Sequence, residues 1–184
     1  ASGKISISTG LLYSAILCFL AFIVLINFNY FTILIALASM PLAFTYPLMK
    51  RYTYWPQLFL GVTFNYGLIL GWTSITGELN IIPIIFYIGA IFWTLGYDTI
   101  YGYQDIKDDE IIGLKSTSIK FKGTAKLFLI ICYLILIFSL LIGGYLMNFN
   151  LLYFVFLIIP MIHLFLHQIR NFNLEDPSKC LKIF

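Results

Sequence analysis

Six long apolar stretches dominate the chain, and short polar joints separate them. They cover about residues 10–28, 31–49, 57–76, 81–101, 124–147 and 151–169. Each has close to the roughly 20 residues that an α-helix needs to cross a membrane. Their apolar residues do not alternate with polar ones as in a barrel strand, and only helices or closed barrels satisfy their backbone in lipid. The pattern predicts an all-α integral membrane protein with about six transmembrane helices, in a single polytopic domain over residues 1–184.

Composition narrows the possible classes of protein. Of the 184 residues, 61% are hydrophobic and only 10% are charged. A soluble domain carries roughly a quarter charged residues, because its surface must be compatible with water. This composition excludes a soluble enzyme, an extended disordered chain and a nucleic-acid-binding module. The only strong physical partner it predicts is the lipid bilayer.

The charges lie almost entirely on one side of the predicted bundle. All 11 Lys and Arg residues fall before the first span, after the sixth, or in and beside the two long loops at 50–56 and 102–123. Of the 8 acidic residues, only Glu78 falls on the other side. Positive charge near membrane spans favours the cytoplasmic side. We therefore expect both chain ends and both long loops to face the cytoplasm, or the matrix in a mitochondrion.

Carboxylates between residues 98 and 110 are the first candidates for chemistry. A carboxylate that closes an apolar span, such as Asp98, costs about 2.5–3.5 kcal/mol on insertion scales and so needs a partner or a purpose. If the fourth helix continues to Asp109, then Asp98, Asp105 and Asp109 lie within about 40° of one another on one helical stripe. A cation such as Mg²⁺, which takes one or two carboxylates with water and phosphate, would relieve their repulsion. The alternative is a hydrated acidic loop that neighbouring lysines neutralise.

Cationic residues near this loop are the second candidates. Tyr46 and Lys50 are four residues apart and share a helix face, and Pro47 predicts a kink or a helix start between them. Lys50 and Arg51 have the chemistry to hold a phosphate, although an interfacial tyrosine with a positive anchor is a common alternative. Lys115 could reach a diphosphate, or it could attract anionic lipid headgroups at about 1 kcal/mol per lysine.

The remaining motifs give weaker signals. His163 and His167 are four residues apart near the end of the sixth span, but a third metal ligand is missing beside them. Asn65 lies within the third span, where it could line a cavity or bond to another helix. The sequence has no glycine-rich phosphate loop and no nucleophile elbow.

Several segments together resemble the UbiA prenyltransferase superfamily. Residues 97–117, YDTIYGYQDIKDDEIIGLKST, resemble its second aspartate-rich motif, and residues 46–50, YPLMK, resemble its YxxxK motif. Residues 50–57, KRYTYWPQ, look like the version found in the 4-hydroxybenzoate polyprenyltransferase branch. Residues 1–3 resemble the stretch that follows the first aspartate-rich motif of the family.

The resemblance implies a nine-helix bundle around a cavity that opens to lipid. In this family, two aspartate-rich motifs at the cytoplasmic mouth bind Mg²⁺, which holds the diphosphate of a polyprenyl donor. The resemblance implies metal ligation by Asp105 and Asp109 with Asp108 beside them, and catalytic roles for Tyr46, Lys50 and Asp98. It also implies substrate-binding roles for these residues: Tyr46, Lys50, Arg51, Tyr101 and Lys115.

The implied reaction is Mg²⁺-dependent transfer of a polyprenyl group from polyprenyl diphosphate to the ring of 4-hydroxybenzoate, in ubiquinone biosynthesis at a bacterial or mitochondrial inner membrane. Related enzymes of menaquinone or haem O synthesis are the nearest alternative, and a transporter or lipid-binding module is the other. The first aspartate-rich motif, NDxxDxxxD, and a last helix are absent from the sequence. We therefore expect an internal piece with six of the nine helices, inactive in isolation.

Overall fold

The computed structural model describes residues 6–173 and residue 180. This described part is helical and contains no strand, and six of its helices are long and apolar enough to cross a membrane. The predicted all-α membrane fold with six spans is confirmed. Residues 1–3 and three of the cationic residues used above lie outside the described part: Lys4, Lys179 and Lys182.

The first half of the described chain contains three spans. The first is α1 (Ile7–Leu25), and the second is α2 (Tyr30–Thr45). The second continues through a 3₁₀ turn, η1 (Tyr46–Leu48), into the short helix α3 (Met49–Tyr52). The third span is built from two consecutive helices, α4 (Pro56–Phe64) and α5 (Tyr66–Thr76).

The second half contains three further spans. The fourth is α6 (Ile81–Gly102), and the fifth is α9 (Ala125–Leu146). The loop between them carries two short helices, α7 (Ile106–Ile112) and α8 (Thr117–Lys120). The sixth span has three consecutive parts, of which the last is a π-helix: α10 (Leu151–Phe156), α11 (Ile158–Met161) and η2 (Ile162–Ile169).

Side chains in the joints fix where the spans begin. Ser6, Asn29, Asn80 and Asn150 each accept a hydrogen bond from a backbone N–H of the first helical turn that follows. These bonds satisfy amide groups that a helix start leaves unpaired. After α5 the chain turns at Gly77, whose φ of 73° suits glycine. Turn chemistry therefore sets the span boundaries within the apolar sequence.

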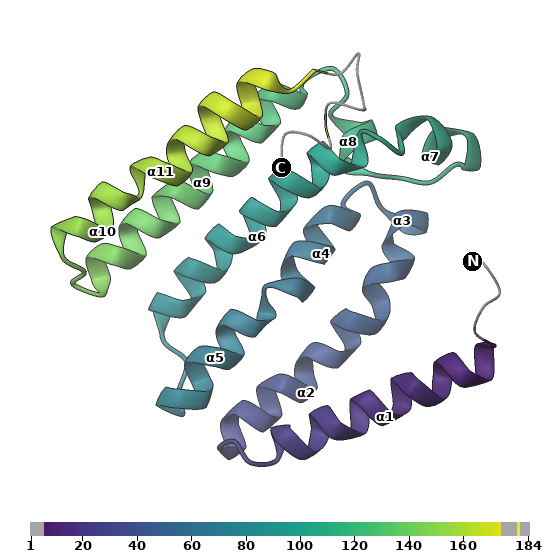
Figure 1. Cartoon of the computed structure of the whole chain (residues 1–184), viewed down its shortest axis with the longest axis vertical. Helices are drawn as coiled ribbons and strands as arrows, with labels where there is room; N and C mark the ends of the chain where they lie inside the picture. The colour runs from purple at the N-terminus through teal and green to yellow at the C-terminus, as the bar shows by residue number, and fades with distance from the viewer. Residues whose placement is uncertain (1–5, 174–179, 181–184) are drawn as a thin grey trace.

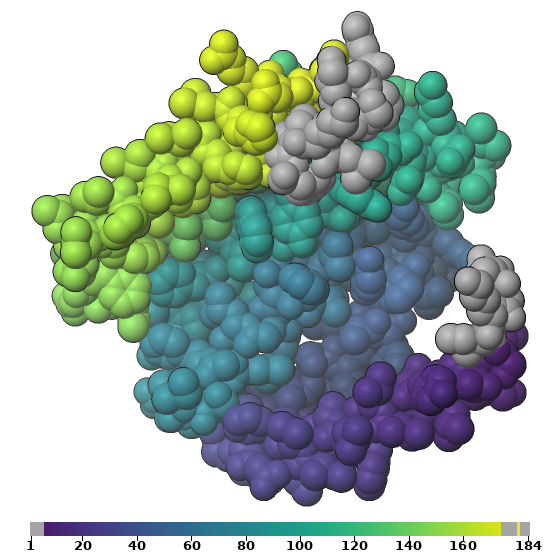
Figure 2. Space-filling model, viewed as in Figure 1, coloured from purple at the N-terminus to yellow at the C-terminus, as the bar shows by residue number. Residues whose placement is uncertain are grey.

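The spans lie side by side in a curved row from α2 to α10 and α11 (Figure 1). α1 lies at one edge of this row and has no buried residue. α3, α7 and α8 gather at the same end of the bundle, so the described parts of both long loops meet there (Figure 1). Figure 2 shows the same arc in space-filling form, with α1 forming its outer edge.

The tightest packing joins α6 to α9. Leu95 of α6 and Leu129 and Tyr133 of α9 are almost completely inaccessible. Two glycines of α6 permit this approach. A Cβ atom built on Gly89 would lie 2.7 Å from the Ser139 Cβ, and one built on Gly96 would meet the Tyr133 ring. Small residues at such contacts let helix backbones come close, as in other membrane bundles.

A methyl group at Gly89 is therefore expected to destabilise the bundle. Gly89→Ala should lower the free energy of unfolding by about 1–3 kcal/mol, because the packed Ser139 Cβ must shift. Gly71→Ala is the matched control, since a Cβ there meets nothing within 4 Å. Thermal unfolding in detergent compares the two variants. Equal melting temperatures would contradict the close α6–α9 contact.

Candidate functional site

Three of the residues singled out in the sequence meet at one cavity. α2 ends at Thr45, and a 3₁₀ turn with Pro47 in its first positions follows, in agreement with the predicted kink or helix start at this proline. The turn places Tyr46 and Lys50 beside Asp98 of α6 around a small cavity of about 70 Å³. The cavity is also lined by the first two residues of α4, Pro56 and Gln57. Two distant segments of the chain thus supply a phenol, an ammonium and a carboxylate to one space.

The expected stripe of aspartates on one continuous helix is wrong. α6 ends at Gly102, and the amides of Tyr103, Gln104 and Asp105 each bond to the carbonyl three residues before them. These tighter bonds turn the chain before α7 begins at Ile106. Asp98 and the later aspartates therefore belong to two different helices.

The turn brings Asp109 to the second span instead. The Lys50 ammonium donates to the Asp109 carboxylate at 3.1 Å, and the Asp109 side chain is buried. A buried carboxylate needs such a partner, because removing an isolated charge from water is costly. Asp105 and Asp108 are exposed on either side of the start of α7. Among the charged side chains, Lys50 and Asp105 lie close enough to act electrostatically on Asp98.

Lys115 belongs to the same corner, mainly through its backbone. Its N–H donates to the Lys50 carbonyl at 2.8 Å, and its ammonium donates to the Tyr52 carbonyl at 3.3 Å. The ammonium also lies 5.6 Å from the centre of the Tyr54 ring. These hydrogen bonds therefore attach the Lys115 segment to the short helix α3, which carries Lys50. Arg51 and Tyr101 are both exposed, and neither lines the 70 Å³ cavity.

A buried polar network holds the loop between α6 and α9 against α6. The sequence analysis did not identify the residues of this network. The Gln57 side-chain oxygen accepts from the Thr117 N–H at 3.0 Å, and the hydroxyls of Thr99 and Thr117 lie 2.7 Å apart. The Ser118 hydroxyl donates to the Thr99 carbonyl at 2.8 Å. The one feature of the sequence that points to this network is Gln57 at the start of an apolar span, and a polar residue there is common at a membrane interface.

A second, wider hollow of about 300 Å³ lies between α6 and the π-helix η2. It is lined by Trp93 and Tyr97 of α6 and by His163 and Gln168 of η2. Asn65, by contrast, bonds between helices, since its amide donates to the Ala90 carbonyl at 3.1 Å.

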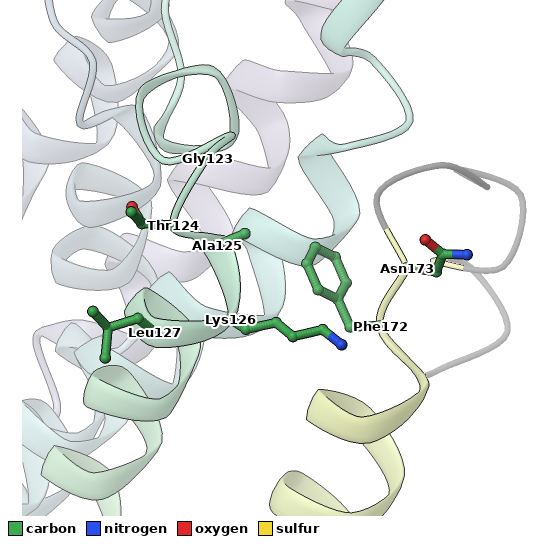
Figure 3. A pocket seen from close by; sticks show the side chains of 7 residues that line it. All are labelled: Gly123, Thr124, Ala125, Lys126, Leu127, Phe172 and Asn173. Carbon is green, nitrogen blue, oxygen red and sulfur yellow. The ribbon is translucent and has the colours of Figure 1, made fainter.

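A third hollow, of about 500 Å³, lies where α9 begins, between Gly123–Leu127 and the pair Phe172 and Asn173 (Figure 3). The Lys126 side chain extends along it toward Phe172 (Figure 3). The candidate residues discussed above do not line this hollow.

Comparison with known proteins identifies the family. The model of the UbiA prenyltransferase family matches residues 1–184. The chain belongs to the UbiA prenyltransferase family. Its fold is therefore the intramembrane fold of that family, as the resemblance implied.

Three similar relatives of this UbiA-family chain carry related names. The 4-hydroxybenzoate geranyltransferase 2 of Lithospermum erythrorhizon is 42% identical over 100% of the chain and 60% of the relative. The mitochondrial 4-hydroxybenzoate polyprenyltransferase of Drosophila melanogaster is 37% identical over 100% of the chain and 47% of the relative. That of Rattus norvegicus is 46% identical over 68% and 34%. The chain thus spans 60% or less of their lengths. No solved structure matches it.

The carboxylates of this UbiA-family chain suit a magnesium ion that is only partly held by protein. Within the described ranges, no group of three or more His, Cys, Asp or Glu side chains lies close enough to form a complete protein cage. Mg²⁺ does not require one, because it takes one or two carboxylates and completes its shell with water and substrate phosphate. Asp105 and Asp109 are one helical turn apart, joined by the Asp109 N–H bond to the Asp105 carbonyl. This donor set fits the ion.

Removing the Gln57 amide is expected to loosen the loop that carries the candidate carboxylates. Gln57→Leu leaves the buried Thr117 N–H without its acceptor, which costs about 1–3 kcal/mol. Amide hydrogen exchange at Thr117 should accelerate accordingly. The control is Thr63→Val, because the Thr63 hydroxyl bonds only within its own helix, to the Phe59 carbonyl. Unchanged exchange at Thr117 would show that Gln57 does not hold the loop.

Proposed function

We propose that the protein to which this chain belongs transfers a prenyl group from a prenyl diphosphate to the ring of 4-hydroxybenzoate. Relatives with that activity in their names support the acceptor and the reaction class. The observation that carries the proposal is the Lys50–Asp109 ion pair, which joins the YxxxK-like segment to the aspartate-rich segment beside the cavity of Tyr46 and Asp98.

The ion pair supplies both halves of a diphosphate-binding site. Lys50 offers a cation for phosphate oxygens, and Asp109 offers a carboxylate for a metal. In the unliganded protein the two charges neutralise each other at 3.1 Å. A magnesium diphosphate carries both complementary charges, so it can replace the pair without leaving either side chain unpaired. We infer that Lys50 then binds the diphosphate while Asp105 and Asp109, with Asp108 beside them, hold the ion.

The reaction breaks the bond between the allylic carbon and the diphosphate oxygen. Negative charge grows on the leaving diphosphate, and the Lys50 ammonium stabilises it. When bound, Mg²⁺ supplies further positive charge to those oxygens. A ring carbon ortho to the acceptor hydroxyl then bonds to the allylic carbon, and the ring loses a proton. We assign Tyr46 and Asp98 to the same cavity wall, where they orient Lys50 and the diphosphate.

We further propose that the reaction belongs to ubiquinone biosynthesis in a bacterial or mitochondrial inner membrane. The Drosophila and rat relatives are mitochondrial by name. The positive charge of the loop end favours an orientation with the site facing the cytoplasm or matrix. A transporter fits less well, because its ionisable residues would lie near the bilayer midplane.

Neutralising the metal-binding carboxylates should abolish transfer. Asp105→Asn and Asp109→Asn are each expected to lower kcat/KM at least about 100-fold, because the charge that holds the ion is lost. The matched control is Glu110→Gln, which removes a carboxylate from the same helix. Its surface pair with Lys122 contributes little to stability.

Prenyl transfer is measured in membranes with protein expressed from the complete open reading frame, after thermal unfolding confirms that each variant is folded. Wild-type activity in Asp105→Asn, whose side chain is exposed and not needed for packing, would overturn the metal assignment.

Removing the Lys50 charge should weaken donor binding selectively. Lys50→Gln is expected to raise the KM for the prenyl diphosphate about tenfold or more, since a charged hydrogen bond contributes about 1.5–3 kcal/mol. The KM for 4-hydroxybenzoate should stay unchanged. Lys122→Gln, which also removes a lysine from an ion pair in this region, is the control. A rise in the acceptor KM alone would assign Lys50 to the other substrate.

A further inference from the structure

A chain of hydrogen bonds leads from the core into the 300 Å³ hollow between α6 and η2. The Tyr133 hydroxyl, which is fully buried, donates to the side-chain oxygen of Gln168 at 2.6 Å. The Gln168 side-chain nitrogen lies 3.4 Å from Nε2 of His163. Gln168 itself is 4% exposed, whereas His163 is exposed and lines the hollow. Two buried groups thus hold one accessible imidazole.

The chemistry of these groups gives the chain a direction. The Gln168 oxygen accepts from Tyr133, so its NH₂ group faces His163. An amide NH₂ can only donate, and therefore Nε2 of His163 must accept. A neutral imidazole has one N–H, so the proton lies on Nδ1. His163 is consequently held as a hydrogen-bond donor through Nδ1.

The π-helix is what makes this contact possible. His163 and Gln168 are five residues apart, and in an α-helix such residues point about 140° away from each other. In a π-helix the backbone bonds run between residues five apart, which brings them onto one side. η2 covers Ile162–Ile169 and therefore contains both residues. π-Helical turns are rare and occur frequently at functional sites.

The opposite wall of the hollow is aromatic and adjoins the proposed donor site. The rings of Trp93 and Tyr97 meet edge to face, with their centres 5.2 Å apart. Tyr97 immediately precedes Asp98, which lines the cavity with Tyr46 and Lys50. Consecutive residues of α6 thus face the hollow and the diphosphate cavity.

We propose that this hollow binds the aromatic acceptor, with the His163 Nδ1–H donating to an oxygen substituent of the acceptor ring and the ring lying against Trp93 and Tyr97. The assignment rests on the proposed prenyl transfer. The acceptor suits the site better than the prenyl chain, because an isoprenoid has no atom to accept from the imidazole and would leave its N–H unpaired. His163 is then a substrate-binding residue, and Gln168 and Tyr133 are positioning residues.

His163→Phe tests the contact directly, because it keeps an aromatic ring but removes the N–H. In membranes with protein from the complete open reading frame, the KM for 4-hydroxybenzoate should rise about tenfold, the effect of one lost hydrogen bond. The KM for the prenyl diphosphate should not change. The matched control is His167→Phe, since His167 stacks on His163 at 5.3 Å but does not line the hollow. Unchanged acceptor KM in His163→Phe overturns the proposal.

Two inhibitors identify the oxygen that His163 contacts. Benzoate lacks the hydroxyl of 4-hydroxybenzoate, and phenol lacks the carboxylate. We expect His163→Phe to weaken inhibition by only one of them, the one that retains the contacted oxygen. Equal inhibition of wild type and variant by both compounds would overturn the contact, as would an equal loss for both.

A third measurement separates positioning from general stability. Gln168→Met should raise the acceptor KM in the wild-type protein but not in the His163→Phe variant, because Gln168 acts through His163. Additive effects would mean that Gln168 has only a structural role, and would overturn the proposal that Gln168 positions His163. If wild-type protein prenylates no aromatic acceptor, the proposed function itself fails. If it does so and His163→Phe is kinetically normal, only the acceptor assignment fails.

Discussion

Lipid offers no hydrogen-bonding partner to a peptide group, and this constraint governs most of the structure. It forces each apolar stretch into a helix that pairs its own backbone groups. It also confines charged side chains to the ends of the spans, where water or an opposite charge is available. The buried pair of Lys50 and Asp109 lies at such an end. Chemistry that needs ions is therefore possible at that end.

α6 organises this division, because each of its faces meets a different environment. Gly89 and Gly96 lie against α9 and bring the two helices into close contact. Thr94 accepts from Asn65 at 2.7 Å and so links α6 to the break in the third span. At its loop end, Asp98 and Tyr97 line two different hollows. One rigid helix thus fixes the distance between the proposed donor and acceptor sites, which a loop could not do as precisely.

The sequence predicted the features that depend on local pattern. The apolar runs predicted the spans, and the asparagines between them predicted the joints. Both features depend only on residues that are neighbours in the sequence. The predicted aspartate stripe was wrong because it required α6 to continue past Gly102, whereas tighter local bonds turn the chain there. Long-range bonds such as that from the Thr117 N–H to Gln57 then hold the rest of the loop in place. The π-helix at His163 could not be predicted either, because its run of apolar residues looks like that of an α-helix. The period of apolar residues does not report where a helix tightens, widens or stops within such a sequence.

The two hollows beside α6 differ in a way that suits two different substrates. The smaller one carries a full positive charge on Lys50 and a carboxylate on Asp98, which suits the proposed metal-bound diphosphate. The larger one presents an imidazole, a carboxamide and two aromatic rings, and its lining residues include no Lys, Arg, Asp or Glu. The two proposed substrates thus meet different surroundings, with charged groups at the smaller hollow and aromatic rings, an imidazole and a carboxamide at the larger one. In the proposed reaction the allylic carbon must reach both hollows, and consecutive residues of α6 line them.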